Sequence, residues 1–449
     1  SAIVPGVDDF IYGAKNLNKL GELSNFPFLI SNLRCDKCDL VDENFKPYII
    51  KKIKGINIAV LGIVDTELSE KVLSHHIKGI STVSVKRTLD YWIPQLKKIS
   101  DMIIILTSTG VPYDREIFYN DFIEELTTGD FWDNNNQKLN AIQMGYFSKG
   151  VDLIVSGGVS KGYRIPWRDP NTGTLVMQNY GNGTSFGHIE LEIVNKKFSA
   201  YNFVVKNNQT QTLLLDDFYP EVNSRSWINS KNKIALSKLY HTFNPTKKIK
   251  RTKYPVQKNR VEDNWPFPII GRKDRFEILT WNCEFFPVSD EETIKALAEA
   301  ISDFNIDVIA FQEIKKMGWF SKLMKLLPNY NFTVSDHSSF MHQAIIYKKN
   351  QFRLVRKVEP FSDNDYNFAG RPPLRVDLFR YQDSSYYSII NLHMKCCDSG
   401  LNRRKNASKM LYDYIDNDIK NGYSNFIVLG DWNDDLKDKY DQHCFSPFL

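Results

Sequence analysis

The feature that most constrains the fold is a series of short apolar runs separated by stretches of helical length. In the first half these runs span 55–64, 101–106 and 150–155, and a helical pattern lies at 84–98. Runs of this kind, buried on both faces and joined by helices, are typical of layered α/β domains. The stretch 187–194 alternates apolar and polar residues, which predicts a half-buried edge strand.

The second half repeats this pattern after an interval of weaker periodicity. Its apolar runs lie at 276–281, 307–311, 343–347, 387–391 and 425–429, and helical spacing appears at 291–304 and 406–419. We expect an α/β fold of two layered sandwiches. The predicted divisions are a first domain at 1–205, a linker at 206–272 and a second domain at 273–449.

The predicted linker contains prolines and a strongly basic run. Between Thr246 and Arg260 there are seven Lys or Arg residues and no acidic residue. We interpret the run as solvated linker in preference to a nucleic-acid contact. One helix is predicted within the linker, from Ile234 to Tyr240.

Size and charge exclude several classes of protein. At 449 residues the chain exceeds one ordinary core, so two or three domains are expected. The net charge is only +5, so a polyanion site would have to be local. No apolar run approaches the roughly 20 residues of a membrane-spanning helix.

The six cysteines do not form the pattern of a disulfide scaffold. Cys35 and Cys38 form an isolated CxxC pair with no second ligand pair for zinc and no thioredoxin-like context. We interpret them as free thiols or as one local disulfide.

Polar residues follow the apolar runs of the second half at the point where each run ends. They are Asn282, Glu313, His393, Asp431 and Asn433. A carboxylate and an amide oxygen suit Mg²⁺ or Mn²⁺, which would polarise a phosphoryl oxygen. We expect the other side chains to handle the water and the phosphate, and Arg371 offers a planar fork for phosphate oxygens. The pattern favours phosphoester hydrolysis.

The same residues lie in short motifs that resemble those of the endonuclease/exonuclease/phosphatase superfamily, which has the pancreatic deoxyribonuclease-like fold. The matching motifs occur in the same order as in the family and span residues 276–438. They lie at 280–282, 311–313, 370–373, 391–395 and 430–434. The resemblance implies that Asn282 and Glu313 take the metal. It implies that His393 acts on the phosphate side and that Asp431 and Asn433 handle the water.

One family feature is missing from the chain. The family closes with an Asp-His pair on a final strand, well beyond the Gly-Asp-x-Asn word, whereas Asp441 and His443 come too early and are interpreted as loop. We expect both chain ends to be cut, and the chain as given to be inactive if the closing base is needed.

Residues 5 to about 195 resemble the catalytic domain of 5′-nucleotidase-type, calcineurin-like metallophosphoesterases. The similar motifs lie at 6–13, 26–32, 152–158, 178–181 and 186–190. The family's metal ligands do not carry over, because Val7-Asp8, Ser108 and Gly158-Val-Ser160 stand where its amide and imidazoles should be. We therefore expect a degenerate domain that holds no dinuclear metal site.

These observations predict a divalent-metal-dependent phosphodiesterase, with a nuclease acting on nucleic acid as the first interpretation. The alternatives are a phosphatase or phospholipase on inositol phosphates or sphingolipids, and a non-catalytic binding module of two inert domains. No specific protein partner can be inferred. The compartment stays open, although both resembled families include many secreted or periplasmic bacterial proteins.

Overall fold

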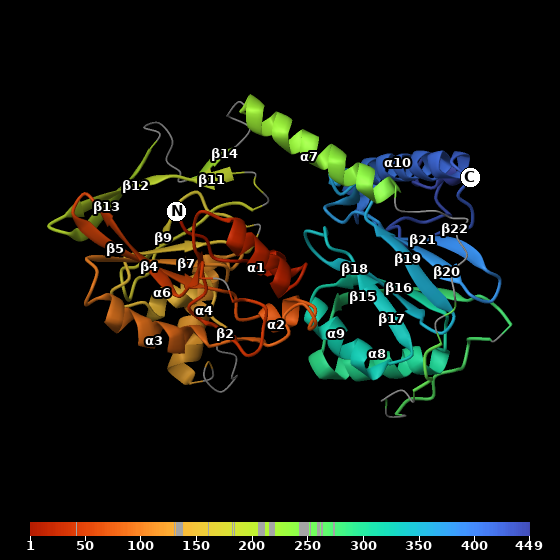
Figure 1. The fold of residues 1–449 in the computed structure, drawn as a ribbon, viewed down its shortest axis with the longest axis horizontal. Helices are drawn as coiled ribbons and strands as arrows, with labels where there is room; N and C mark the ends of the chain where they lie inside the picture. The colour runs from red at the N-terminus through yellow and green to blue at the C-terminus, as the bar shows by residue number, and fades with distance from the viewer. Residues whose placement is uncertain are drawn as a thin grey trace. The chain divides into compact units, whose positions relative to one another are not determined.

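The chain divides into two compact units, Ser1–Arg225 and Ser226–Leu449, which are described separately (Figure 1). The structure is a computed structural model. It describes all residues except 42, 130, 132–137, 160, 182, 184, 205–211, 215–220, 242–250, 252, 258–260, 262–263 and 273. No helix in the described part of the chain is both long and apolar enough to cross a bilayer.

The first unit is built on a six-stranded sheet whose central strands are parallel. In spatial order its strands are β4 (Tyr48–Ile53), β5 (Ile56–Ile63), β7 (Met102–Thr107), β8 (Leu153–Ser156), β10 (Leu175–Gln178) and β9 (Trp167–Arg168). The edge strands β4 and β9 run antiparallel to their neighbours. β-branched residues dominate β5 and β7, as expected for strands covered on both faces.

Different layers cover the two faces of this sheet (Figure 1). One face packs on three helices, α3 (Val85–Leu96), α4 (Arg115–Thr128) and α6 (Ala141–Phe147). The other face contacts a hairpin of β12 (Ile189–Val194) and β13 (Lys197–Phe203). This packing makes the unit an α/β/β sandwich.

The remaining elements of the chain up to the second unit's first strand are short or peripheral. They are η1 (Val7–Phe10), α1 (Ala14–Leu23), β1 (Phe28–Leu29), β2 (Leu33–Cys35), β3 (Phe45–Lys46), α2 (Leu68–Lys71), β6 (Ile80–Thr82), β11 (Ser185–Gly187), β14 (Thr212–Leu214) and α7 (Val222–His241). Cys35 and Cys38 are joined by a disulfide, one of the two states that the sequence left open.

The second unit contains two four-stranded sheets packed face to face. The first sheet has the order β15 (Ile278–Phe286), β16 (Val308–Ile314), β18 (His342–Lys348) and β17 (Tyr330–Val334). The second has the order β19 (Phe352–Val358), β20 (Leu374–Arg380), β21 (Ser385–His393) and β22 (Phe426–Asp431). Their facing side chains form a continuous apolar core that includes Val308, Ile345, Val376 and Ile389.

Helices cover the outer faces of this sandwich (Figure 1). Two of them, α8 (Asp290–Phe304) and α9 (Met317–Leu326), contact one another on the side of the first sheet. On the other side, α10 (Leu401–Lys420) packs on β21 through Ala407, Leu411 and Ile415. The short helices η3 (Tyr366–Phe368), η4 (Asp398–Gly400) and η5 (Ser446–Phe448) complete the unit.

The prediction of two layered α/β units is confirmed. Each apolar run singled out in the sequence forms a strand, and the alternating stretch 187–194 contains β12, whose residues alternate between half-buried and exposed. The predicted helix at 234–240 is part of the longer α7. The edge strand β22 pairs with β21 alone among the described strands.

The described residues in the second half of the predicted linker are mostly exposed, and a few of them make hydrogen bonds to the second unit. Arg251 donates from Nη2 to the carbonyl of Asn350, and Gln257 exchanges two hydrogen bonds with Asn329. The basic residues Lys247, Lys248, Lys250, Lys258 and Arg260 lie outside the described residues. Arg251 and Lys253, the two members of the basic run that the structure describes, are exposed, as expected for a solvated run. The boundaries 206–272 stay a prediction.

Candidate active site

Strand register brings the predicted site residues together at one end of the second unit's sandwich. The parallel strands β21 and β22 pair His393 with Asp431. The parallel strands β15 and β16 pair Asn282 with Gln312, so Glu313 comes one residue later. Because parallel strands end at the same edge, the polar residues that follow them meet there.

Asn282 links the two carboxylates of this cluster. Its Nδ2 donates to Glu313 Oε1 at 3.0 Å and to Asp431 Oδ2 at 2.8 Å. Its Oδ1 accepts from the amide of Glu284 at 2.9 Å. A cation ligand role for Asn282 therefore requires the amide to turn so that Oδ1 faces the carboxylates.

Glu313, His393 and Asp431 form a group whose ligand atoms lie within 4.8 Å of one another. In the described part of the chain it is the one group of three or more His, Cys, Asp or Glu side chains with that spacing. Two half-buried carboxylates side by side repel one another unless a cation neutralises them. The donor set is oxygen-rich, as Mg²⁺ and Mn²⁺ prefer.

The backbone at Glu313 adopts a left-handed conformation, with φ of +64°. For a residue with a Cβ this conformation costs about 1 kcal/mol or more. It breaks the regular alternation of β16 and turns the carboxylate toward Asn282, while Oε2 accepts from the amide of Phe285. Non-glycine residues held in such conformations cluster at functional sites.

His393 is a neutral imidazole at physiological pH. The pKa of its imidazole is lowered to about 4, mainly by burial and also by the charge of the neighbouring Arg371, against the opposing charges of Asp431 and Glu313. Its Nε2 lies 3.6 Å from Glu313 Oε1 and 3.8 Å from Asp431 Oδ2. Its Nδ1 is buried and has no hydrogen-bond partner among the residues that the structure describes, so the ring keeps unused hydrogen-bonding capacity inside the site.

The low pKa of His393 predicts that acid destabilises the second unit. Above pH 6.5 the imidazole is neutral in both the folded and unfolded states. As the pH falls from 6.5 to 4, only the unfolded state takes up the proton, so the free energy of unfolding drops by roughly 3 kcal/mol. Hydrogen exchange of β16 and β21 amides, measured in chelator at several pH values, should show this loss in the wild type and not in His393→Gln.

His337 is a control, because its pKa is shifted in the opposite direction to that of His393. Its hydrogen bond with Glu359 raises the pKa of the imidazole. Its stabilising effect is therefore complete below pH 6.5 and is lost as the pH rises through the raised pKa. An acid loss that persists in His393→Gln would contradict the assignment to His393.

The carbonyl of Met394 joins two further predicted residues to the strand end. Arg371 donates from Nη2 to this carbonyl at 2.9 Å and from Nε to the carbonyl of His393 at 3.2 Å. Asn433 donates from Nδ2 to Met394 O at 3.0 Å, and its amide bonds Asp431 Oδ1 at 2.8 Å. Arg371 is nearly buried, and burial lowers the pKa of its guanidinium. It braces the end of β21, and its contact with phosphate stays a prediction.

A buried amide pair that sequence reasoning did not assign connects the two sheets beneath the site. Gln312 Nε2 donates to Asn391 Oδ1 at 2.7 Å, and Asn391 Nδ2 donates to the carbonyl of Phe311 at 2.8 Å. Both side chains are fully buried. The sequence does indicate this pair in one way, because each amide lies within or next to an apolar run. A polar side chain in a buried strand needs a hydrogen-bond partner.

Arg404, a basic residue near the start of α10, has a structural role beside the candidate site. It is 5% exposed, and its Nε donates to Asp434 Oδ2 at 3.0 Å. Its Nη1 donates to the carbonyls of Lys395 and Cys397. The guanidinium therefore ties the segment after β21 to the segment after β22.

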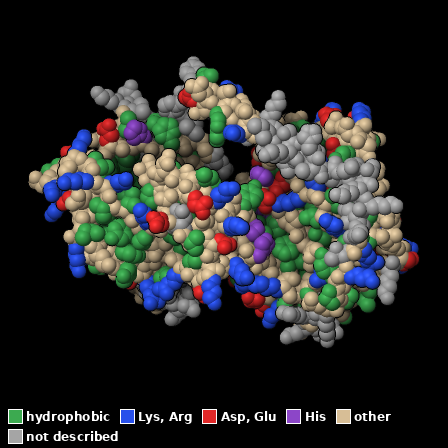
Figure 2. Space-filling view, viewed as in Figure 1, with side chains coloured by type: hydrophobic (Ala, Val, Ile, Leu, Met, Phe, Trp, Pro, Cys, Tyr) green, Lys and Arg blue, Asp and Glu red, His purple; other side chains and the backbone are tan. Residues whose placement is uncertain are grey.

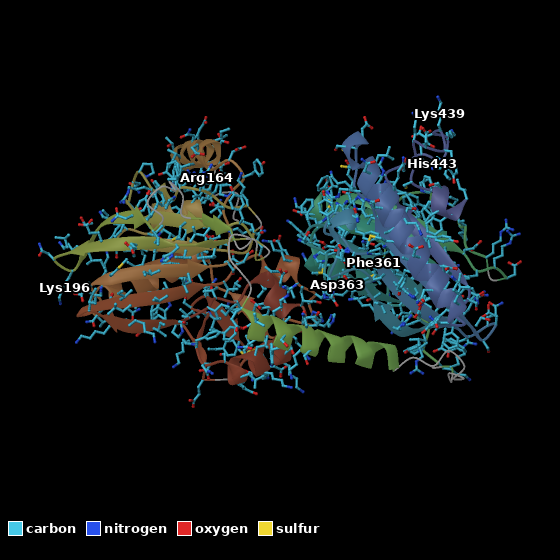
Figure 3. All side chains as sticks on the ribbon, turned by 90° about the horizontal axis from the view of Figure 1, so that it is seen from above. Arg164, Lys196, Phe361, Asp363, Lys439 and His443 are labelled. Atoms are coloured by element: carbon cyan, nitrogen blue, oxygen red, sulfur yellow. A yellow bond between two sulfur atoms is a disulfide. The ribbon has the colours of Figure 1, made fainter. Side chains whose placement is uncertain are left out.

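The segment after β22 forms turns, as predicted for Asp441 and His443 (Figure 3). Figure 3 shows Lys439 and His443 on this segment, with Lys439 projecting outward. His443 is 3% exposed, and its Nδ1 accepts from the amide of Phe445. This histidine therefore supports its own loop.

The positions of the missing metal ligands in the first unit are occupied by structural contacts. Ser108 is buried, donates to the carbonyl of Pro5 and accepts from the amide of Asp65. Gly158 lies so close that an added Cβ would be 2.1 Å from the carbonyl of Ser108. Asp8 is exposed, and Ser160 lies outside the described residues. The absence of a dinuclear metal centre in this unit stays a prediction.

Comparison with known proteins shows which families parts of this chain are similar to. Residues 279–440 match the model of the Endonuclease/Exonuclease/phosphatase family. A cell wall protein of Listeria monocytogenes, Lmo0130, is 25% identical over 179 residues, which cover 38% of this chain and 20% of that protein. The match thus spans about a fifth of this curated relative.

Two solved structures are among those similar to this chain. A putative 5′-nucleotidase from Staphylococcus aureus has a TM-score of 0.42 at 15% identity, covering 74% of this chain and 57% of its own. An endonuclease/exonuclease/phosphatase family protein from Bacteroides thetaiotaomicron has a TM-score of 0.28 at 18% identity, covering 34% and 58%. The similar structures thus include both families that the sequence resembles, and the resemblance in residues 276–438 is confirmed by the match to the endonuclease/exonuclease/phosphatase family.

Proposed function

We propose that the second unit is a divalent-metal-dependent phosphodiesterase and that nucleic acid is its substrate. The family match over residues 279–440 indicates a phosphoester hydrolase. The observation that carries the finer proposal is the convergence of Glu313, His393 and Asp431 at the ends of three strands. The donor chemistry of this group fits Mg²⁺ or Mn²⁺.

Glu313 and Asn282 would hold the cation, which when bound would polarise a phosphoryl oxygen and stabilise the leaving oxygen. Asp431 orients the attacking water and accepts its proton, and the side chain of Asn433 aligns that water. His393 stays neutral near pH 7, so it donates a hydrogen bond to a phosphate oxygen without bringing a charge. Arg371 offers positive charge behind the phosphate while it braces the end of β21.

The charge of the chain requires contacts with a polyanion to be local. On the face drawn in Figure 2, Lys and Arg side chains are scattered among Asp and Glu. The site itself contributes Arg371, with Lys395 two residues beyond His393. A phosphodiester bound at the cluster would meet these cations without an extended basic surface.

The proposal predicts that the chain nicks supercoiled DNA when Mg²⁺ or Mn²⁺ is present and not in excess chelator. A soluble phosphodiester such as bis-p-nitrophenyl phosphate should be cleaved faster than p-nitrophenyl phosphate, because the diester carries one negative charge where the monoester carries about two near pH 7. Calorimetric titration with Mn²⁺ provides a readout that needs no turnover. Faster cleavage of the monoester, or of sphingomyelin or an inositol phosphate, would overturn the nuclease proposal in favour of the second function class. Absence of Mn²⁺ binding would overturn the metal-dependent mechanism itself.

We keep a secreted or periplasmic location as a proposal. The Cys35–Cys38 disulfide is of the kind that persists in oxidising compartments. One relative is named as a cell wall protein. These two observations agree, and they support export of the chain from the cytoplasm.

A further inference from the structure

Two adjacent cysteines lie immediately beyond the candidate active site, and the proposed hydrolysis does not use them. Cys397 is exposed and Cys396 is half-buried. The thiol of Cys397 donates to Cys396 Sγ across 2.9 Å, and Lys395 Nζ donates to the same sulfur at 3.4 Å. These contacts lower the pKa of the Cys396 thiol, the bond from Cys397 being the main cause.

This geometry is that of a reactive thiol with a resolving thiol beside it. The thiolate is the nucleophile in disulfide exchange, and a donor with a positive charge favours it. The two sulfur atoms need to approach by only about 0.9 Å to reach a disulfide bond length of roughly 2.0 Å. Exposure of Cys397 leaves the pair open to a reagent from solvent.

We propose that Cys396 and Cys397 form a thiol modification site, which a small-molecule disulfide converts reversibly into a disulfide between neighbouring residues. The Cys396 thiolate attacks one sulfur of the oxidant, forms a mixed disulfide and releases one thiolate. Cys397 loses its proton and attacks Cys396 Sγ, which releases the second thiolate. The pair gives up two electrons and two protons, and the oxidant is reduced to two thiols.

The bond formed there is easily reduced again. Neighbouring Cα atoms lie about 3.8 Å apart across a trans peptide, below the roughly 4.4 Å at which ordinary disulfides begin. Strained and exposed disulfides have the higher reduction potentials that are typical of labile bonds. The site is therefore suited to reversible change.

The cysteines belong to a backbone segment that the site depends on. The carbonyl of Cys397 accepts from Arg404 Nη1 at 2.8 Å, and the carbonyl of Lys395 accepts from the same nitrogen at 3.0 Å. Arg404 in turn holds Asp434, the neighbour of Asn433. Met394 lies three residues before Cys397, and its carbonyl accepts hydrogen bonds from Arg371 and Asn433. A disulfide that pulls Cys397 toward Cys396 therefore shifts the backbone carbonyls to which Arg404, Arg371 and Asn433 donate hydrogen bonds.

Peptide mapping tests the chemistry without any enzymatic assay. Trypsin cuts after Lys395 and after Arg403, so both cysteines fall in one peptide, residues 396–403. The full chain is incubated with oxidised glutathione, its remaining thiols are blocked with N-ethylmaleimide, and it is then digested. We expect peptide 396–403 to lose two hydrogens and carry no maleimide, and dithiothreitol to restore two maleimide sites.

Single variants separate the resolving step from simple modification. In Cys397→Ser the Cys396 thiol should retain glutathione as a mixed disulfide. Cys444→Ser is the matched control, because Cys444 is buried and its raised pKa keeps it unreactive. A wild-type peptide with two maleimides, or with glutathione on each cysteine, would overturn the proposal.

The effect on the site has a readout of its own. Oxidation should speed hydrogen exchange at the start of α10 and after β22 in the wild type, and not in Cys396→Ser. If the proposed function holds, phosphodiester cleavage should fall by about tenfold or more on oxidation and recover with dithiothreitol. Unchanged exchange would overturn the coupling to the site. If the chain proves not to be a hydrolase, mapping and exchange still decide the dithiol proposal.

Discussion

Replacement of Glu313 by Gln is expected to weaken Mn²⁺ binding and phosphodiester cleavage by roughly 100-fold or more, because it removes a charged ligand from the proposed metal cluster. Gln keeps the volume of the side chain and one carbonyl oxygen, so the hydrogen bond from Asn282 can persist. Calorimetric Mn²⁺ titration and cleavage of bis-p-nitrophenyl phosphate measure the two losses separately.

The same substitution should raise the stability of the metal-free protein. Glu313 and Asp431 accept from a single nitrogen of Asn282, so their negative charges lie close together in the absence of a cation. Removing one charge relieves a repulsion of roughly 1 kcal/mol. In chelator, the variant should therefore unfold at a higher urea concentration than the wild type, and Mn²⁺ should stabilise it less.

Glu291→Gln is the matched control for Glu313→Gln. Glu291 is an exposed carboxylate on α8 that pairs with Lys322, and its replacement should change neither metal binding nor cleavage. If Glu313→Gln kept full Mn²⁺ affinity and full cleavage, the site would have to be sought elsewhere.

The convergence of the candidate site residues could be predicted from the sequence because the information for it is local. An apolar run that ends in a polar residue specifies both a buried strand and the place where a side chain leaves it. Asn282, Glu313, His393 and Asp431 each follow this rule. The parallel pairing of β15 with β16 and of β21 with β22 then brings the strand ends together.

The partners of these residues could not be predicted, because they depend on contacts between distant segments. Nothing local distinguishes Arg371, which braces the carbonyls of His393 and Met394, from an arginine that binds phosphate. Arg404 lies in a basic stretch, yet the depth at which α10 packs buries its guanidinium against Asp434. The bond from Gln312 to Asn391 requires knowledge that the two sheets face one another.

The strands β19 and β20 could not be predicted from the sequence for the same reason. Both are sheet strands of the second unit, and the apolar pattern did not single them out. Their sequences alternate charged and apolar residues, and the charged ones include Arg375 and Asp377, both fully buried. Such residues indicate a surface when they are considered singly, and only their mutual pairing explains their burial.

Replacement of Arg375 by Met is accordingly expected to destabilise the second unit by about 3–5 kcal/mol, because it leaves buried carboxylates without their partner. Arg375 is completely buried, and its Nε pairs with Asp377 Oδ1 at 2.9 Å. Its Nη1 contacts Asp418 and donates to Tyr414 Oη at 2.7 Å, so it joins β20 to α10. Urea unfolding followed by hydrogen exchange in β20 and β21 measures the loss.

Two further variants identify its cause. Lys409→Met breaks an exposed pair with Asp413 on the same helix and should cost less than about 1 kcal/mol. Adding Asp418→Asn to Arg375→Met should recover part of the lost stability, because it removes one of the stranded charges, whereas a pure packing defect would not be relieved. A loss below about 1 kcal/mol in Arg375→Met would mean that water or Arg356, which already pairs with Asp377 at 2.6 Å, compensates the buried charge. The network would then specify how α10 docks on the sheet without adding to its stability.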